Sequence, residues 1–403
     1  MTRAARTRMY TTLAAAFIAC TAATMGQADA GTTGPAATAA TAPGGLAGLQ
    51  AQVSQIEGHA AALSATEQAR VRHYWTAWRM EHALPLRAAG ATRAAGKATG
   101  GAQRTWMRAA VTTARPKAKT KTTAKPKASA KPAAKASASA AATKAASTAR
   151  PAGGWLSVPP QSAQRAPLAP ALTASTAVAR WNGGGAVADT TGKVFFSLGS
   201  DDYVCSGSTV ASANSDVVVT AGHCVDSTGT WATNWTFVPG YDNGNAPYGS
   251  YTARQFYVSS AWSNQANNDD DVAFVTVNQD SLDGASVPVA QEVGGQGIKF
   301  GVQPKVVTVF GYPSDPPYNG QQLFYCSGAT KSDPYKATTD AGMRCDMTAG
   351  SSGGPWLDGF DWSTGTGTIT SVSSFKYSNN NQILYGPRLT STAQALYQAA
   401  EHS

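Results

Sequence analysis

Residues 181–403 predict an all-β domain, preceded by a helical segment and by a basic arm without a core of its own. In these residues short runs of β-branched and aromatic side chains follow one another, separated by clusters rich in Gly, Pro, Asn and Asp. Helical periodicity is missing between the runs. Many short strands without intervening helices favour a β-barrel or a β-sandwich.

The charge of the chain changes at about residue 180. The net charge of +9 is the sum of two opposite parts. Residues 1–180 have 23 basic and 4 acidic side chains, and residues 181–403 have 9 basic and 19 acidic ones. The two halves therefore carry +19 and −10. A chain of 403 residues with this asymmetry predicts one folded domain behind a long pro-region.

The first 30 residues predict a secretory signal peptide. Three arginines lie within the first eight residues, an apolar stretch runs over Leu13–Ala19, and Ala28-Asp29-Ala30 is a small-residue cleavage signal. The apolar stretch is too short to span a bilayer, and no other membrane-spanning segment is expected. Cys20 is a weak candidate for a lipid anchor. We therefore expect a secreted, extracellular protein.

Residues 31–90 predict a helical pro-region. Apolar side chains recur three and four positions apart at Leu46, Leu49, Val53, Ile56, Ala60 and Leu63. A capping box, Ser64 to Glu67, opens a second helix through Val71, Trp75 and Trp78 that should end near Leu84-Pro85. The two helices would form a hairpin whose apolar face packs on itself or on the domain that follows.

Residues 91–180 predict a disordered linker rich in Ala, Lys and Pro. From Arg87 to Arg180 there are 17 Lys and Arg and no Asp or Glu. Such a composition buries too little apolar surface to offset the entropy lost on ordering. A cationic arm would bind polyanions. Because export disfavours DNA, we expect no specific nucleic acid and consider an anionic cell-wall polymer, or no partner at all.

The strand runs of the all-β domain can be placed individually. They are Lys193–Leu198, Val217–Thr220, Trp235–Val238, Gln255–Val258, Val272–Val277, Val306–Phe310, Leu323–Cys326 and Thr368–Phe375. A closing helix is expected over Ser391–Glu401.

One loop, Gly350-Ser351-Ser352-Gly353-Gly354-Pro355, predicts a nucleophile. Glycines on both sides let the backbone turn tightly and expose the Ser352 hydroxyl. The loop also fits the α/β-hydrolase pattern G-x-S-x-G, but that fold places its acid and histidine after the serine, where only His402 is available.

Upstream, a histidine and an acid each stand at the end of a strand run. His223 follows Val217–Thr220, and Asp271 directly precedes the run that begins at Val272. Asp269 and Asp270 are alternatives for the acid, but Asp271 abuts the strand. The chain order His, Asp, Ser is one of the known orders of a serine protease triad.

At TAGHC, DVAF and GSSGGP the chain resembles the chymotrypsin-like (trypsin-like) serine endopeptidases, within them the bacterial secreted, glutamyl-endopeptidase-like branch. The resemblance covers roughly residues 181–403 and implies two six-stranded Greek-key β-barrels with a short C-terminal helix. It makes Ser352 the nucleophile, His223 the general acid and base, and Asp271 the carboxylate that orients the imidazole. The N–H groups of Gly350 and Ser352 would form the oxyanion hole.

Cysteine and histidine usage favours disulfides over a metal site. After removal of a signal peptide, four cysteines remain, an even number for an exported protein, and they allow three pairings. We favour Cys205 with Cys224, which would brace the His223 turn, and Cys326 with Cys345. No cofactor and no metal are expected.

Two departures from the resembled family bear on activation and specificity. Ser351 stands where digestive relatives carry the Asp that receives the new N-terminal amine. Counting back from Ser352 places Asp346 where trypsin-type enzymes bind Lys or Arg. The glutamate-specific branch has a pocket histidine on the strand after the nucleophile, and here Val372, Ser373 and Ser374 stand in that region. We predict that Asp346 and Ser373 contact substrate and that Asp346 favours Lys or Arg before the scissile bond.

The sequence therefore predicts a secreted serine endopeptidase, made as a zymogen, that acts on proteins or peptides and contacts its own pro-region. Two alternatives belong to other classes of protein. One is a protease-like binding module without catalysis, and the other is a polyanion-binding wall protein that acts through its cationic arm.

Overall fold

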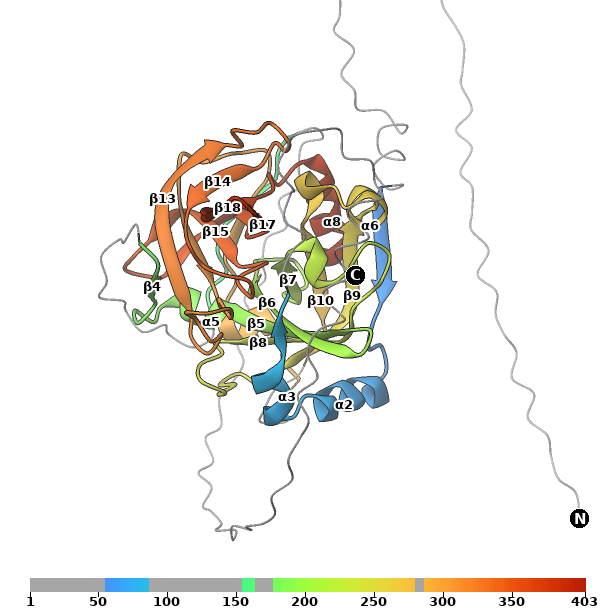
Figure 1. The fold of residues 1–403 in the computed structure, drawn as a ribbon. Helices are drawn as coiled ribbons and strands as arrows, with labels where there is room; N and C mark the ends of the chain where they lie inside the picture. The colour runs from blue at the N-terminus through green and yellow to red at the C-terminus, as the bar shows by residue number, and fades with distance from the viewer. Residues whose placement is uncertain (1–54, 87–153, 164–176, 280–285) are drawn as a thin grey trace, which may run out of the picture. The chain divides into compact units, whose positions relative to one another are not determined.

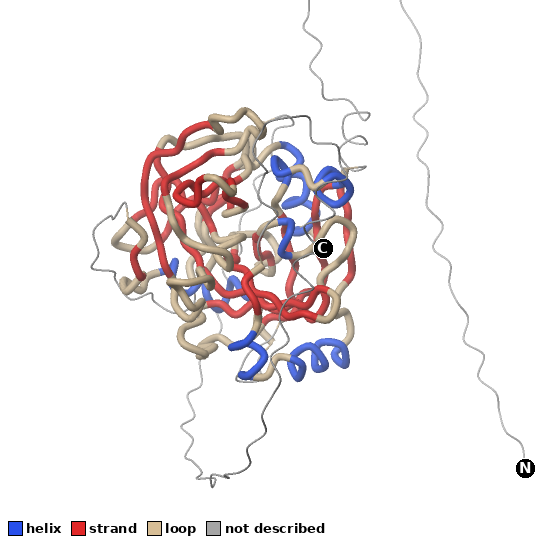
Figure 2. Tube along the Cα trace, viewed as in Figure 1, coloured by secondary structure: helices blue, strands red, loops and turns tan. Residues whose placement is uncertain are grey.

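The computed structural model of the chain describes residues 55–86, 154–163, 177–279 and 286–403. All of these residues belong to one unit, Gly44–Ser403. The predicted signal peptide and most of the predicted linker lie outside the described residues. Strands dominate the described part of the chain, and helices are few and short (Figure 2).

The first sheet contains a closed barrel of six strands. The order β9-β10-β7-β6-β5-β8 returns to β9, because β8 also pairs with β9. The strands are β5 (Thr191–Leu198), β6 (Asp201–Thr209), β7 (Val217–Thr220), β8 (Thr233–Pro239), β9 (Tyr251–Ser259) and β10 (Ala273–Val277). Most side chains of β5, β7 and β10 are buried, which agrees with their nearly continuous apolar sequences.

The second sheet follows the order β17-β18-β14-β13-β12-β15-β16-β11-β3, with β4 paired to β13. Its longer strands are β12 (Val306–Gly311), β13 (Phe324–Ser332), β14 (Ala341–Arg344), β15 (Pro355–Asp361), β16 (Thr366–Val372) and β18 (Asn380–Gly386), and its shorter ones include β11 (Gly297–Lys299) and β17 (Phe375–Tyr377). Strands β18 and β16 also approach each other, because a Cβ at Gly386 would stand 2.4 Å from Val372 O. The predicted all-β class is therefore confirmed, with one closed six-stranded barrel and a second sheet, which has ten strands where six were predicted.

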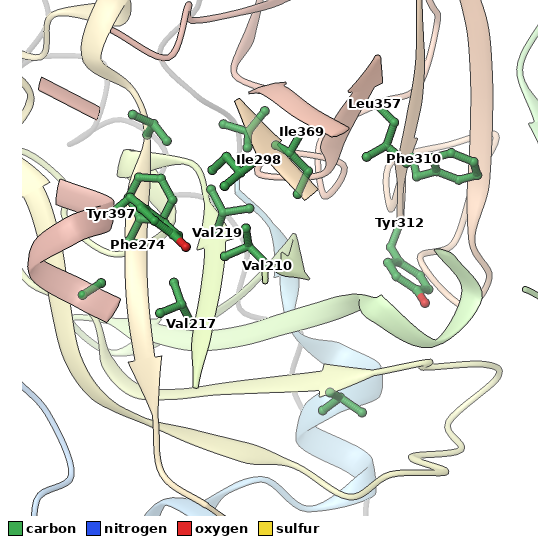
Figure 3. Close-up of a cluster of buried hydrophobic side chains, with 14 of the residues drawn as sticks. Val210, Val217, Val219, Phe274, Ile298, Phe310, Tyr312, Leu357, Ile369 and Tyr397 are labelled. Atoms are coloured by element: carbon green, nitrogen blue, oxygen red, sulfur yellow. The ribbon is translucent and has the colours of Figure 1, made fainter. Parts of the chain in front are cut away.

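One apolar cluster joins the two sheets. It combines Val217 and Phe274 of the first sheet with Phe310 and Leu357 of the second, and Tyr397 of the last helix closes one side (Figure 3). Burial of each such side chain contributes about 1.5–3 kcal/mol. This shared core fixes the positions of the two sheets relative to each other.

Short helices fill the connections between strands. They are α5 (Ala186–Thr190), η1 (Gly222–Cys224), α6 (Ser260–Gln265), η2 (Asn268–Asp270), α7 (Val289–Val293) and α8 (Ser391–Glu401). Helix α8 has the predicted bounds and packs against β9 and β10 (Figure 1). No helix among the described ranges is long and apolar enough to cross a membrane.

The prediction of a first helix in the pro-region is wrong for the described residues of that segment. Residues Ile56–Ala60 form strand β1, which pairs antiparallel with β9; Leu46, Leu49 and Val53 lie outside the described residues. The pattern of apolar residues fits a helix, but the edge of β9 offers a full ladder of backbone hydrogen bonds. Tertiary pairing has overridden the local pattern.

The second predicted helix is divided in two. Helix α2 (Ala65–Tyr74) begins with the predicted capping box, in which Glu67 N–H donates to Ser64 Oγ at 3.2 Å. Helix α3 (Ala77–His82) follows, with Thr76 as its own N-cap, and β2 (Leu84–Pro85) pairs with β6. The break lies at Trp75, whose buried indole donates to Asn234 O.

The predicted disordered linker contains two short ordered pieces. Strand β3 (Ser157–Val158) pairs with β11, and β4 (Ala179–Arg180) pairs with β13. Leu156 N–H also donates to Gln394 Oε1 at 2.9 Å. The linker prediction is therefore wrong at these residues, which add to the second sheet.

Candidate active site

His223 lies in η1, immediately after strand β7. The glycine before it is required by close packing, because a Cβ at Gly222 would stand 2.9 Å from the Trp262 ring. The disulfide between Cys205 and Cys224 ties the turn to β6. The turn that carries the imidazole is therefore fixed at the end of β7 by the Trp262 ring and by the disulfide.

Asp271 reaches His223 because of the register between two strands. Strands β10 and β7 are antiparallel, and Ala273 stands opposite Thr220. The residues just before β10 therefore lie beside those just after β7. These residues are Asp271 and His223.

The Asp271 carboxylate accepts three hydrogen bonds. Oδ2 accepts from His223 Nδ1 at 2.8 Å, and Oδ1 accepts from the His223 N–H at 2.8 Å. Ser374 Oγ also donates to Oδ2. Because an ionised carboxylate can only accept, Nδ1 carries the ring proton and Nε2 is the basic nitrogen.

Two opposing effects act on the pKa of Asp271. Burial, which leaves Asp271 only 1% exposed, by itself raises the pKa. The charge of His223 and the hydrogen bonds from His223 and Ser374 outweigh burial, so the pKa of Asp271 lies below its ordinary value. The carboxylate therefore stays ionised at neutral pH.

Ser352 lies on the predicted glycine loop, before strand β15. Gly350 has φ +97° and Gly353 has φ +80°, a region that glycine adopts without strain. A Cβ at Gly353 would stand 2.1 Å from Thr220 Oγ1, so only glycine lets the loop approach the end of β7 so closely. Ser352 O lies 3.9 Å from Cys224 Sγ. The loop thus comes to the turn that carries His223.

Several polar groups of the site have no partner among the described residues. His223 Nε2 is buried without a hydrogen bond, and the N–H groups of Gly350 and Ser352 donate to no described residue. The intervening Ser351 N–H donates instead to Thr348 O at 3.2 Å. No hydrogen bond joins Ser352 Oγ to Nε2; in resting active sites this bond is often long and tightens when substrate binds.

The structure places Asp346 at the surface. Tyr318 OH donates to its Oδ1 at 3.3 Å, and the amino group of Lys376 lies near enough to interact with it. Burial lowers the pKa of Lys376 to about 8, and the Asp346 charge opposes this shift. The predicted preference for Lys or Arg assumed a buried carboxylate without a partner. Asp346 is instead exposed and has Lys376 beside it, so the preference stays a prediction that depends on Lys376.

The structure gives Ser373, which was predicted to contact substrate, and its neighbour Ser374 different partners. Ser373 is fully buried, and its Oγ accepts from Trp356 Nε1 at 3.1 Å, so its hydroxyl faces the interior and not a substrate. Ser374 instead reaches Asp271. Adjacent residues of an extended chain point to opposite sides, and the sequence contains no signal that tells which of two neighbouring serines faces the site.

The two favoured disulfides, Cys205–Cys224 and Cys326–Cys345, are both present. Sγ of Cys205 and Cys224 and a ring nitrogen of His223 lie within 4.8 Å of one another, as metal ligands could. Both sulfurs are bonded to each other, however, so neither can act as a thiolate ligand. This donor set does not fit a metal ion.

Comparison with known proteins finds similarity to peptidases. A family model described as a trypsin-like peptidase domain matches residues 205–364. An extracellular metalloprotease of Bacillus subtilis (strain 168) is 36% identical over 80 residues, which are 20% of this chain and 25% of that protein. A glutamyl endopeptidase of Bacillus licheniformis is 29% identical over 143 residues, which are 34% of this chain and 41% of that protein. The chain thus spans less than half the length of either curated relative.

A solved structure covers the domain more fully. The crystal structure of the thermostable serine protease AL20, from an extremophilic microorganism, is 36% identical and has a TM-score of 0.50; the match covers 54% of this chain and 99% of that chain. Because nearly all of that protease is covered, and because the matched family domain spans His223, Asp271 and Ser352, the chain belongs to the trypsin-like peptidases of chymotrypsin-like fold.

Proposed function

We propose that the protein is a secreted serine endopeptidase that hydrolyses peptide bonds through Ser352, His223 and Asp271. The pairing of His223 with Asp271 carries the proposal. The two side chains are 3% and 1% exposed, their polar atoms are 2.8 Å apart, and Nε2 is left unpartnered beside the glycine loop. A histidine that served only the core would use both ring nitrogens.

In the proposed reaction Nε2 of His223 takes the proton of Ser352 Oγ as that oxygen attacks the scissile carbonyl. Asp271 holds the proton of Nδ1 and stabilises the imidazolium that forms. His223 then returns the proton to the leaving amine, and an acyl group stays on Ser352. Water, activated by the same nitrogen, releases it.

The negative oxygen of the tetrahedral intermediate needs donors near Ser352. The N–H groups of Gly350 and Ser352 flank the nucleophile, and neither is used by another described residue. Removal of one such donor typically raises the barrier by about 3 kcal/mol. These two groups are the proposed oxyanion hole.

Two disulfides support an extracellular location, since such bonds persist in oxidising compartments. Proteins or peptides outside the cell are the proposed substrates. A catalytically inactive binding module is disfavoured because no described side chain occupies His223 Nε2. Binding of polyanions through the cationic arm is compatible with catalysis and concerns residues outside the described ranges.

Variants of the nucleophile and the base test the proposal. Ser352→Ala and His223→Ala should each abolish peptide hydrolysis, by up to about 10⁶-fold, because the two groups act as a unit. Ser363→Ala, in an exposed turn, serves as the control and should keep wild-type activity. Hydrolysis that survives in both folded triad variants would contradict the proposal.

A further inference from the structure

Ser206 connects both sheets to the nucleophile loop. It lies on β6 of the first sheet and is fully buried. Its N–H donates to Ser352 O at 2.7 Å, and its Oγ donates to Gly350 O at 2.8 Å. Tyr312 N–H, just after β12 of the second sheet, donates to the same Oγ at 2.9 Å. Thr220 Oγ1 donates to Ser206 O at 2.8 Å.

The hydroxyl of Ser206 has a single orientation in this network. A serine hydroxyl donates one hydrogen bond and accepts up to two. Because Tyr312 N–H can only donate, the Ser206 hydrogen is directed to Gly350 O. A buried donor and a buried acceptor would both lose a partner if this hydroxyl were removed.

Every peptide plane of the loop from Ala349 to Gly353 is held by a hydrogen bond to its carbonyl. Ser314 N–H holds Ala349 O at 2.7 Å, and Gly354 N–H holds Ser351 O at 3.0 Å. The carbonyls of Gly350 and Ser352 are held by Ser206. Since each peptide is planar, holding the carbonyls sets the direction of the N–H groups. Ser206 therefore holds two of the four planes, the Gly350–Ser351 plane through its hydroxyl and the Ser352–Gly353 plane through its N–H. These two planes lie on either side of the plane that carries the Ser352 N–H.

The chain has no carboxylate at the place where digestive relatives receive a new N-terminal amine. Ser351 stands there, and its Oγ donates to Thr348 O at 2.8 Å within the same loop. Order in the loop must therefore come from other groups, among them the hydrogen bonds to its carbonyls.

We propose that Ser206 is a positioning residue that keeps the oxyanion-hole backbone in its working conformation, in place of an ion pair with a new N-terminus. The inference rests on the proposed peptidase function. It implies that the catalytic loop forms without cleavage of the chain. Loss of the Ser206 hydroxyl should weaken stabilisation of the oxyanion more than binding of the substrate.

The experiment compares Ser206→Ala with Ser208→Ala in the full chain. Ser208 lies on the same strand and is also fully buried, but its Oγ donates only to the neighbouring Thr209 O at 3.1 Å. Active sites are counted by titration with a fluorophosphonate. The kcat and KM for a peptide substrate and the Kd of a peptide boronic acid, which forms a tetrahedral adduct with the serine, are then measured per titrated site.

Ser206→Ala should lower kcat by about 10- to 100-fold, less than complete removal of an oxyanion donor. The boronic acid should bind more weakly by a similar factor, while KM changes less than about threefold, and Ser208→Ala should match wild type. Ser206→Gly removes the same hydroxyl, so whichever variant folds with intact disulfides serves the test. A wild-type kcat and boronate affinity per titrated site would overturn the inference. A wild-type chain that neither hydrolyses peptides nor reacts with fluorophosphonate would overturn the proposed function instead.

Discussion

Asp271 and its neighbour Asp270 differ in their partners, and this difference decides which of them serves His223. Asp271 accepts both His223 bonds, whereas Asp270 accepts from Asn267 Nδ2 at 2.8 Å. Asp271→Asn should therefore lower kcat by about 10⁴-fold, since an amide stabilises the wrong tautomer of the imidazole. Asp270→Asn is the matched control and should stay within about threefold of wild type. The reverse order of the two losses would show that Asp270 is the triad acid.

Asp340 should make stability depend on pH. It is fully buried, and both of its carboxylate oxygens lack a donor among the described residues. Burial, followed by the charges of Asp269, Asp271 and Asp333, raises its pKa to about 9. The folded protein therefore keeps a proton that the unfolded chain releases above about pH 4. This contribution to stability is complete below pH 4 and is lost as pH rises towards 9.

Asp340→Asn has no carboxyl proton to lose at this position, so this dependence of stability on pH should disappear. Between pH 5 and 8 the free energy of unfolding of wild type should fall relative to the variant by up to about 1.4 kcal/mol per pH unit. Urea unfolding at several pH values measures the difference, and Asp358→Asn, a half-buried carboxyl on β15, is the control. Parallel curves for wild type and Asp340→Asn would contradict the expectation.

Lys376 and Asp346 together should decide whether a basic side chain is accepted before the scissile bond. The amino group of Lys376 donates to Cys345 O at 2.8 Å, and its positive charge attracts the carboxylate of Asp346. We predict that Lys376→Met frees the carboxylate and increases cleavage after Lys and Arg by about tenfold, the effect of one modest ion pair. Profiling on a peptide library measures it. Addition of Asp346→Ser should remove the gain, and a gain that persists would show that Asp346 is not involved.

Sequence reasoning finds residues whose chemistry is carried by a local motif and misses those defined by distant partners. His223 and Ser352 stand in recognisable turns. Ser206, Ser374 and Asp340 are ordinary polar residues, and their importance comes from distant parts of the chain. Ser206 contacts Gly350, 144 positions away, and Ser374 contacts Asp271, 103 positions away. Asp340 is buried near Asp269 and Asp271. No pattern in the sequence marks them.

At the level of elements, the described part of the predicted pro-region, residues 55–86, adds two strands to the first sheet. Strand β1 adds to the edge of β9, and Trp75, 7% exposed, packs 5.5 Å from the Phe195 ring. Asn278 Nδ2 donates to Ala62 O at 2.8 Å. The ion pair of Arg79 with Asp202 is partly exposed and contributes at most about 1 kcal/mol. Backbone pairing and apolar burial, rather than charge, therefore dominate this contact.

We predict that the pro-region stays bound after the arm is cut. A specific protease site inserted between residues 87 and 153 allows cleavage, and size-exclusion chromatography then follows the two pieces. The pieces should co-elute in 1 M salt, where the Debye length is about 3 Å. Trp75→Ala should release the pro-region, whereas Trp78→Ala, at a side chain 65% exposed, should not. Release of the wild-type piece by salt alone would show that charge holds it.

Elements with continuous β-branched or aromatic runs are predictable, and mixed ones are not. Val217–Thr220, for example, has the expected bounds. Strands β6, β15 and β18 carry glycine and polar residues that read as turns, yet each forms because neighbours on both sides complete its ladder. The opposite error occurs at β1, which was predicted as a helix from its periodicity but forms a strand on the edge of β9.

At the level of the whole molecule, the charge division at about residue 180 separates a basic half from the acidic β domain, but it does not separate an unfolded part from a folded one. Residues 55–86, 154–163 and 177–180 of the basic half contribute to the two sheets. The family motifs could be placed from the sequence because they specify turns. The docking of the pro-region could not, since it depends on an edge that exists only once the barrel has formed.

The most direct test of the central claim, that His223 and Asp271 make Ser352 a nucleophile, is intact-mass analysis after reaction with diisopropyl fluorophosphate. We expect one adduct per folded chain, mapped by peptide sequencing to Ser352 and not to Ser351, and its loss in His223→Ala. A folded wild-type protein that takes up no adduct, or takes it up on another serine, would contradict the account.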